Sequence, residues 1–263
     1  MRHSLAVFLL LTLVACSSTP KVGEGDKNAT AEELYTSAKI FLDDKSYENA
    51  IKRYEKLQSR YPYGRYAQQA MLEMAYAYYK KGEPDPAISA VDRFIKQFPN
   101  NEHVDYAIYL KGLANFSADK GMLNDISGEE ASDRDPQMTQ DSYAAFKDLI
   151  TRYPDSQYVP DALIRMQYLV NQMARHDLHV ANYYLRRGAN IAAVNRAQEV
   201  LKFFPNSTST RPALLVMVRA YDAMGMTDMR DDTQRVLNLN GGSEAATAQA
   251  IARDKKSWWQ FWK

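Results

Sequence analysis

The fold is decided by two stretches that share one pattern: residues 34–62 read LYTSAKIFLDDKSYENAIKRYEKLQSRYP, and residues 71–99 read MLEMAYAYYKKGEPDPAISAVDRFIKQFP. The second stretch repeats the first at an offset of 37 residues. The matching positions are Leu34, Ala38, Phe41, Ala50, Tyr54, Leu57 and Pro62, then Met71, Ala75, Tyr78, Ala87, Val91, Phe94 and Pro99. Within each helix-length segment the apolar residues recur three, four or seven residues apart, which places them on one helix face.

This spacing is the tetratricopeptide pattern, in which about 34 residues form a hairpin of two helices. One hairpin cannot bury its apolar face alone, so neighbouring hairpins stack into a solenoid. Two unrelated amphipathic hairpins would not match at so many positions with one offset. We therefore predict an all-α, right-handed α-solenoid of about five tetratricopeptide repeats over residues 31–239.

The amino-terminal end has the pattern of an export signal. A basic start is followed by an apolar run over residues 5–15 that is too short to span a bilayer. Residues 13–16 read LVAC, which resembles the bacterial lipobox. That resemblance implies that residues 1–15 are a signal peptide and that Cys16 becomes an N-palmitoyl, S-diacylglycerol cysteine. The alternative is an ordinary secreted protein with a stray cysteine at its cleavage site.

Residues after the cleavage site are expected to tie the protein to a membrane. Residues 16–30 are small and polar without an apolar period, and we expect a lipidated tether there. By resemblance to lipoprotein sorting, Ser17 after the cysteine indicates the outer membrane. We therefore expect a lipid-anchored protein whose body lies on the periplasmic face.

Charge and composition limit the function of the mature chain. Of the 33 lysines and arginines, Arg2 leaves with the signal peptide, so 32 basic residues face 32 acidic ones. This balance argues against a nucleic-acid binder, which would need a basic excess to displace counterions. With 46% apolar residues and only 11 glycines among 263 positions, the chain can bury a sizeable helical core.

The third repeat is longer than the first two. The step from Pro99 to its closing proline, Pro154, exceeds the step from Pro62 to Pro99 by nearly half a repeat. We expect the extra residues to form an insertion at about residues 118–136, between the two helices of this repeat. Insertions in solenoids are often binding elements. The alternative is a solvated loop in which Asp135 caps the next helix.

The fourth repeat is longer as well, but for a different reason. The surplus in the step from Pro154 to its closing proline, Pro205, is close to four helical turns of about 3.6 residues each. Residues 161–187 contain no glycine or proline and keep a helical period. We therefore predict one long helix that ends at Gly188. The remaining helices are expected over residues 191–203, 211–223 and 227–239, with Gly225 at the last turn.

The chain ends in an aromatic tail. All three tryptophans lie in residues 257–263, which read SWWQFWK, after a loose stretch over residues 240–256. Exposed tryptophans carry a free-energy cost, so we expect this tail to dock. We rank a groove of the chain's own body or a partner above the lipid interface, because the tail is too short for a strong amphipathic helix.

No arrangement of residues points to catalysis. His176 and His179 lie near Asp177 on one expected helix, but a zinc site needs three or four convergent ligands. The sequence has no phosphate-binding loop, dinucleotide glycine fingerprint or nucleophile elbow. We therefore predict a binding protein that is not an enzyme and has no metal or cofactor.

Several motifs together resemble one family of bacterial envelope proteins. They are Arg60-Tyr61-Pro62 with Gly64, Asp92-Arg93-Phe94-Ile95, Asp105-Tyr106, Ser132-Asp133-Arg134-Asp135-Pro136, Tyr153-Pro154-Asp155-Ser156-Gln157-Tyr158 and Val194-Asn195-Arg196. With the anchor and the repeats, they resemble the BamD family, also called ComL, over about residues 34–239. The aromatic tail departs from the shorter polar ends of many family members.

The resemblance implies a scaffold in the BAM complex, which inserts β-barrel proteins into the outer membrane. Its C-terminal repeats would hold the POTRA region of the barrel-forming subunit, with small accessory lipoproteins, and its N-terminal repeats would receive unfolded outer-membrane proteins. The partner-binding residues implied are Arg196, as an ion-pair donor, and Asp133, Arg134 and Asp135. The residues nominated for substrate contact are Tyr61, Tyr63, Arg65 and Tyr66.

Two other functions stay open on the sequence alone. One is another periplasmic repeat lipoprotein, an adaptor that coordinates cell-wall synthesis or outer-membrane constriction. It would share the repeats and the anchor but not the insertion motif. The other is a peptidoglycan-remodelling enzyme or its subunit, which would need a catalytic constellation.

Overall fold

The computed structural model describes residues 28–119 and 137–240. This part of the chain contains ten α-helices and no strand. The helices are α1 (Ala31–Asp43), α2 (Tyr47–Arg60), α3 (Arg65–Lys81), α4 (Pro84–Gln97), α5 (Val104–Asp119), α7 (Gln137–Arg152), α8 (Val159–Arg186), α9 (Asn190–Phe203), α10 (Thr210–Ala223) and α11 (Thr227–Leu239). The expected signal peptide, Cys16, the insertion residues Asp133, Arg134 and Asp135, and the aromatic tail lie outside the described residues.

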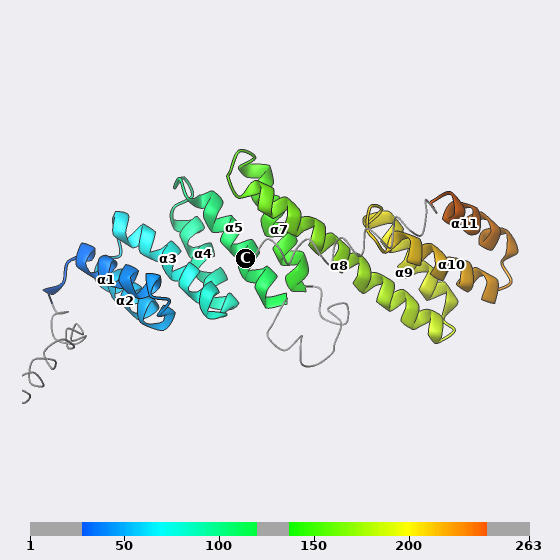
Figure 1. The fold of residues 1–263 in the computed structure, drawn as a ribbon, viewed down its shortest axis with the longest axis horizontal. Helices are drawn as coiled ribbons and strands as arrows, with labels where there is room; N and C mark the ends of the chain where they lie inside the picture. The colour runs from blue at the N-terminus through cyan, green and yellow to red at the C-terminus, as the bar shows by residue number, and fades with distance from the viewer. Residues whose placement is uncertain (1–27, 120–136, 241–263) are drawn as a thin grey trace, which may run out of the picture.

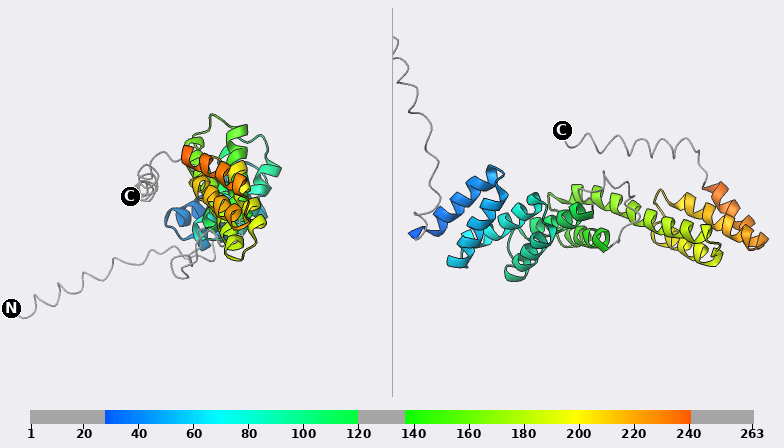
Figure 2. Two further views of the ribbon diagram at one scale, coloured as in Figure 1. Left: turned by 90° about the vertical axis from the view of Figure 1, so that its right-hand side faces the viewer. Right: turned by 90° about the horizontal axis from the view of Figure 1, so that it is seen from below.

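The ten helices form five hairpins that stack one after another. The pairs are α1 with α2, α3 with α4, α5 with α7, α8 with α9, and α10 with α11, and each second helix also packs on the first helix of the next hairpin. The hairpins follow one another along a single long axis (Figure 1), and the molecule is narrow when seen along that axis (Figure 2). The predicted all-α solenoid of about five helical hairpins is confirmed.

Helix boundaries follow the chemistry of the residues at the ends. Thr30 and Glu33 form a capping box at the start of α1, because Glu33 N donates to Thr30 Oγ1 at 3.2 Å and Thr30 N donates to Glu33 Oε2 at 2.8 Å. Gly82 ends α3 in the left-handed conformation, with φ of 82°, which glycine adopts without strain. Pro86 lies in the first turn of α4, where a missing N–H is tolerated.

The long helix predicted for the fourth repeat is α8, which has 28 residues and is followed by Gly188 with φ of 73°. It joins two separate hydrophobic cores. The larger core runs from Leu34 in α1 to Leu169 in α8, and the smaller core begins at Ala174 in the same helix and ends at Tyr221 in α10. One helix therefore supplies side chains to both cores, and the solenoid is continuous across the junction.

The junction between the two cores is polar and hydrogen-bonded. Asn171 is buried on α8 between Leu169 and Ala174, and its Oδ1 accepts a hydrogen bond from the amide of Thr208 at 3.1 Å. The same side chain donates to the carbonyl of Gln167 at 3.1 Å. A buried amide with both groups satisfied fixes the α9–α10 turn against the middle of α8. Despite the length of α8, none of the described helices has the apolar content needed to cross a membrane.

The two helices of the third hairpin, α5 and α7, approach each other closely at a glycine. A Cβ on Gly112 of α5 would lie 2.4 Å from Cε1 of Phe146, a fully buried residue of α7. The hydroxyl of Ser142 donates to the Gly112 carbonyl at 2.9 Å. The backbone of α5 therefore touches the Phe146 ring, and no side chain fits between them.

We expect Gly112→Ala to destabilise the protein by about 1–3 kcal/mol, because the added methyl group overpacks a close helix contact. The measurement is the free energy of unfolding in urea. Phe146→Leu in the same chain should recover part of the loss, so that the double variant is less destabilised than the sum of the two single variants. Strictly additive effects would show that the two residues do not compete for space.

Candidate binding surfaces

The first helices of the first three hairpins form a groove. In the stack, α1 contacts α3 and α3 contacts α5, and the hollow along them has a volume of about 560 Å³. We call it the tyrosine–lysine groove, and define it by Lys39, Lys45, Tyr47, Tyr76, Lys80 and Tyr106. The three lysines outnumber the two acidic residues that also line the groove, Asp43 and Glu73. Aromatic faces and surplus ammonium groups suit a polypeptide that carries aromatic and acidic groups.

A single carboxylate organises the side of this groove. Glu73 of α3 accepts a hydrogen bond from Tyr35 Oη of α1 at 2.8 Å and another from Tyr54 Oη of α2. Burial and the nearby Glu73 raise the pKa of both phenols, which keeps them hydrogen-bond donors even in alkaline solution. Lys39 Nζ lies 3.8 Å from the same carboxylate. Three helices are therefore tied together at one charged point on the groove.

The cationic side chains of the groove are arranged by backbone geometry. Lys45, in the turn after α1, has φ of 58°, which is uncommon for a residue with a side chain. Lys80 lies in the last turn of α3, where a positive charge is favoured by the helix dipole. Both lysines are exposed. Burial raises the pKa of Tyr106, which keeps its phenol uncharged within the groove.

Sequence reasoning missed this groove, although the repeat contains a signal for it. Lys39 and Tyr76 are separated by the same offset that relates the two repeats, and so are Asp43 and Lys80. Equivalent positions on successive first helices must line one face of the stack. Polar and aromatic residues at these positions, beside the apolar ones, mark a surface in contact with solvent.

The four residues nominated for substrate contact lie around the turn between α2 and α3, but they differ in exposure. Tyr61 is partly buried, and its hydroxyl donates to the carbonyl of Ala29 at 3.0 Å, which holds the segment before α1. The Tyr66 ring lies 5.4 Å from that of Tyr35, and Arg65 Nη2 donates to the Tyr66 hydroxyl at 2.9 Å.

Tyr63 is the most exposed of the four. It is 86% exposed and lines a second hollow with Pro62, Arg93 and Phe98. Arg65 is exposed as well. Of the nominated set, Tyr63 and Arg65 are therefore available to a partner, whereas Tyr61 and Tyr66 also pack the first hairpin.

Arg196 lies on the surface of α9, facing α8. Val194, two residues earlier, is buried in the smaller core and fixes the orientation of this part of the helix. Arg196 Nη1 lies 2.8 Å from Glu199 Oε2 and 3.9 Å from Asp177 Oδ1 of α8. The guanidinium is half exposed, so N–H groups that these carboxylates do not use can bind a carboxylate of a partner.

Across residues 28–119 and 137–240, no three side chains of His, Cys, Asp or Glu come together as a metal site would require. His176 and His179 both lie on α8.

A family model described as YfiO, outer membrane lipoprotein, matches residues 27–236. The chain belongs to this family. Curated relatives are named outer membrane protein assembly factor BamD. The one from Neisseria meningitidis serogroup A is 39% identical over 98% of both chains, and the one from Vibrio cholerae is 37% identical over 90% of this chain and 98% of its own. The resemblance to the BamD family is confirmed.

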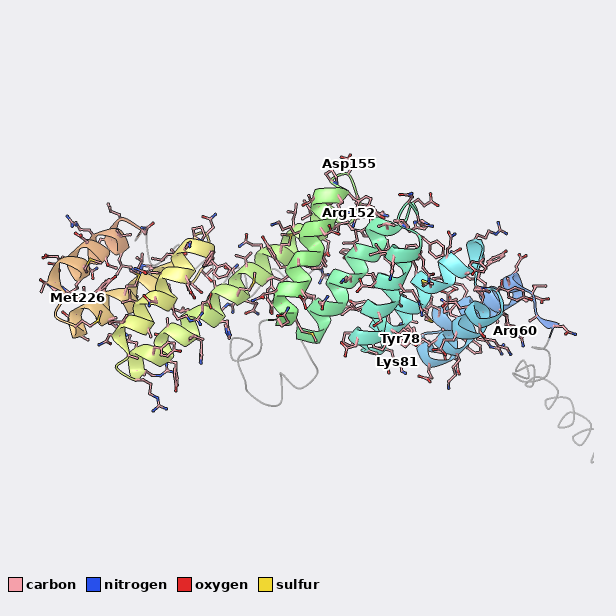
Figure 3. All side chains as sticks on the ribbon, turned by 180° about the vertical axis from the view of Figure 1, so that it is seen from behind. Arg60, Tyr78, Lys81, Arg152, Asp155 and Met226 are labelled. Atoms are coloured by element: carbon pink, nitrogen blue, oxygen red, sulfur yellow. The ribbon has the colours of Figure 1, made fainter. Side chains whose placement is uncertain are left out.

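One of the motifs that resemble the BamD family lies at the junction of the third and fourth hairpins. The stretch from Tyr153 to Tyr158 joins α7 to α8, and Figure 3 shows Arg152 and Asp155 at this corner. Ser156 Oγ donates to Asp105 Oδ2 of α5 at 2.6 Å, and the Tyr158 ring stacks on that of Tyr109 at 4.8 Å. This BamD-family motif therefore locks the third hairpin to the start of α8.

The Asp177 carboxyl has an unusual pH dependence. Burial raises its pKa, while the nearby Arg196 acts in the opposite direction. Because the folded state holds this proton more tightly than the unfolded state, the group contributes stability at low pH that is lost as the pH rises through the raised pKa.

We therefore expect Asp177→Asn to gain stability relative to the wild type as the pH increases from about 3 to about 7. The measurement is the free energy of unfolding in urea at several pH values. Arg196→Ala should shift the wild-type transition to higher pH, because the opposing charge is removed. Parallel pH profiles for Asp177→Asn and the wild type would contradict the assignment.

Proposed function

We propose that the protein is a non-enzymatic scaffold of the BAM complex, anchored through Cys16 at the periplasmic face of the outer membrane. Its C-terminal repeats bind the POTRA region of the barrel-forming subunit, and its N-terminal repeats receive unfolded outer-membrane proteins. The observation that carries this proposal is the match to the BamD assembly factors over nearly the full chain. Small accessory lipoproteins and the insertion residues Asp133, Arg134 and Asp135 belong to the same proposal as partners and partner contacts.

The placement of surfaces supports two distinct binding roles. The tyrosine–lysine groove lies on α1, α3 and α5, which belong to the larger core, whereas Arg196 lies on α9, which belongs to the smaller one. An extended groove along stacked helices suits an extended polypeptide. A half-exposed arginine on a rigid helix suits a folded domain that presents a carboxylate. The two ligands therefore bind without competing.

We expect Arg196→Glu to reduce recovery of the barrel-forming subunit about tenfold when the lipoprotein is purified in mild detergent. The reversed side chain would repel the partner's carboxylate and would stand beside Asp177 and Glu199. Lys52→Glu on α2 is the matched control, since Lys52 is exposed, pairs with a nearby carboxylate, that of Glu48, and lies outside the C-terminal repeats. Unchanged recovery with Arg196→Glu would reject this contact, and recovery of cell-wall proteins instead would reject the function.

We expect Tyr63→Ala to reduce photo-cross-linking of an unfolded β-barrel protein to the N-terminal repeats about fivefold. Tyr63 is 86% exposed, so its removal should leave the melting temperature unchanged. Tyr183→Ala on α8 is the control, because Tyr183 is also exposed, at 45%, but belongs to the fourth hairpin rather than to the N-terminal repeats. Equal loss in both variants would point to nonspecific binding by tyrosines.

A further inference from the structure

A second groove lies between α4, α5 and α7, and we call it the acidic groove. It has a volume of about 590 Å³, which is in the range of pockets that bind ligands. Ile88 and Ile95 of α4, Ile108 of α5 and Met138 of α7 give it an apolar surface. Met138 is 37% exposed. None of the described elements covers this apolar surface, so it can make contact with another segment.

Aspartates surround the apolar surface. Four aspartates line the groove: Asp85, Asp92, Asp141 and Asp148. Asp92 pairs with Lys111 at 2.7 Å, and Asp148 pairs with Arg152 at 3.0 Å. These two basic residues are the only ones among the described residues that line the groove.

The other two acidic residues are Asp85 in the first turn of α4 and Asp141 on α7, and both are exposed. Asp141 accepts a hydrogen bond from the neutral Gln137 amide at 2.9 Å. The groove therefore carries two more negative than positive charges, and an occupant should combine aromatic or apolar groups with positive charge.

The last residues of the chain have that composition. Residues 251–263 read IARDKKSWWQFWK, with four basic residues against one acidic residue and with all three tryptophans of the protein. Tryptophan and arginine are the residues that most often anchor a buried contact. The tail and the groove are thus complementary in both charge and polarity.

The groove is within reach of the tail. A series of contacts leads from the groove toward the end of α11. The Phe116 ring of α5 lies 5.5 Å from the Tyr168 ring of α8. About one turn further along α8, Asn171 accepts a hydrogen bond from the amide of Thr208, which lies just before α10. The end of α11 lies beside the start of α10, because the two helices form a hairpin. Each step from one helix to the helix packed on it covers about 10 Å, so the path from the groove to the end of α11 is about 40 Å. A fully extended chain of the length of residues 241–257 would span at most about 56 Å.

We propose that the tryptophan-rich C-terminal tail docks in the acidic groove of its own chain, with its aromatic side chains on the isoleucines and its basic residues beside Asp85 and Asp141. The attraction is between solvent-exposed charges, so docking weakens as ionic strength rises. A tail in this position covers the second and third hairpins and leaves the tyrosine–lysine groove open.

The test places a fluorescent label in the groove of the full-length lipoprotein. Ala144 is an exposed groove residue on α7, and Ala144→Cys labelled with bimane reports contact with tryptophan, because indole quenches bimane. Cys16 is the only other cysteine, and the acylation proposed above would block it. Ser59→Cys on the exposed surface of α2 is the control label position.

The proposal predicts quenching at Ala144→Cys but not at Ser59→Cys, with no change on dilution. Combining Trp258→Phe, Trp259→Phe and Trp262→Phe should restore the emission. Combining Asp85→Lys with Asp141→Lys should lower the docking equilibrium constant about tenfold, whereas Asp44→Lys, at the exposed end of α1, should leave it unchanged.

Three results would overturn the proposal. Equal emission at the two label positions would place the tail elsewhere. Quenching that disappears on dilution would show that the tail binds another copy of the chain. Recovery of emission when vesicles of phosphatidylethanolamine and phosphatidylglycerol are added would show that the tail prefers a lipid surface.

Discussion

The structure depends on the continuity of α8 across two hydrophobic cores. Leu169 belongs to the first core and Ala174 to the second, and the segment from one to the other includes the buried Asn171. This segment is the interior of a helix rather than a flexible linker, because each backbone amide donates a hydrogen bond to the carbonyl four residues earlier. The hydrogen bond from Thr208 to Asn171 then attaches the later hairpins to the same segment. The first three hairpins and the last two are therefore held as one body.

Polar contacts fasten each hairpin to its neighbour around the apolar interiors. Tyr35 and Tyr54 share Glu73 in the first two hairpins, and Tyr109 Oη donates to Asp161 Oδ2 at 2.6 Å between the third and fourth. A tyrosine buries a large ring while its hydroxyl still finds an acceptor. This dual character explains why so many of the 18 tyrosines lie at junctions between hairpins. Each of these hydrogen bonds joins helices of different hairpins, so together they specify one arrangement of the helices.

Much of this fold could be predicted from the sequence, because the signals are local or periodic. The spacing from Pro154 to Pro205 predicted α8, and Gly188 marked where that helix ends. The grooves could not be found in the same way. Asp85 and Asp141 are distant in the sequence and share a groove only because α4 and α7 flank α5. The contact of Gly112 with Phe146 likewise depends on how two helices cross, which a one-dimensional pattern does not encode.

The length of α8 also sets the direction in which the surfaces beyond it face. Each added residue in an α-helix turns everything beyond it by about 100° and advances it by about 1.5 Å. One residue inserted between Leu169 and Ala174 would swing Arg196 about a quarter-turn around the helix axis, whereas an insertion close to two full turns would nearly restore its direction. The extra length of the fourth repeat is itself close to a whole number of turns. Insertions of whole helical turns in α8 would thus change the distance between the two ends of the solenoid without rotating the surfaces at one end relative to those at the other.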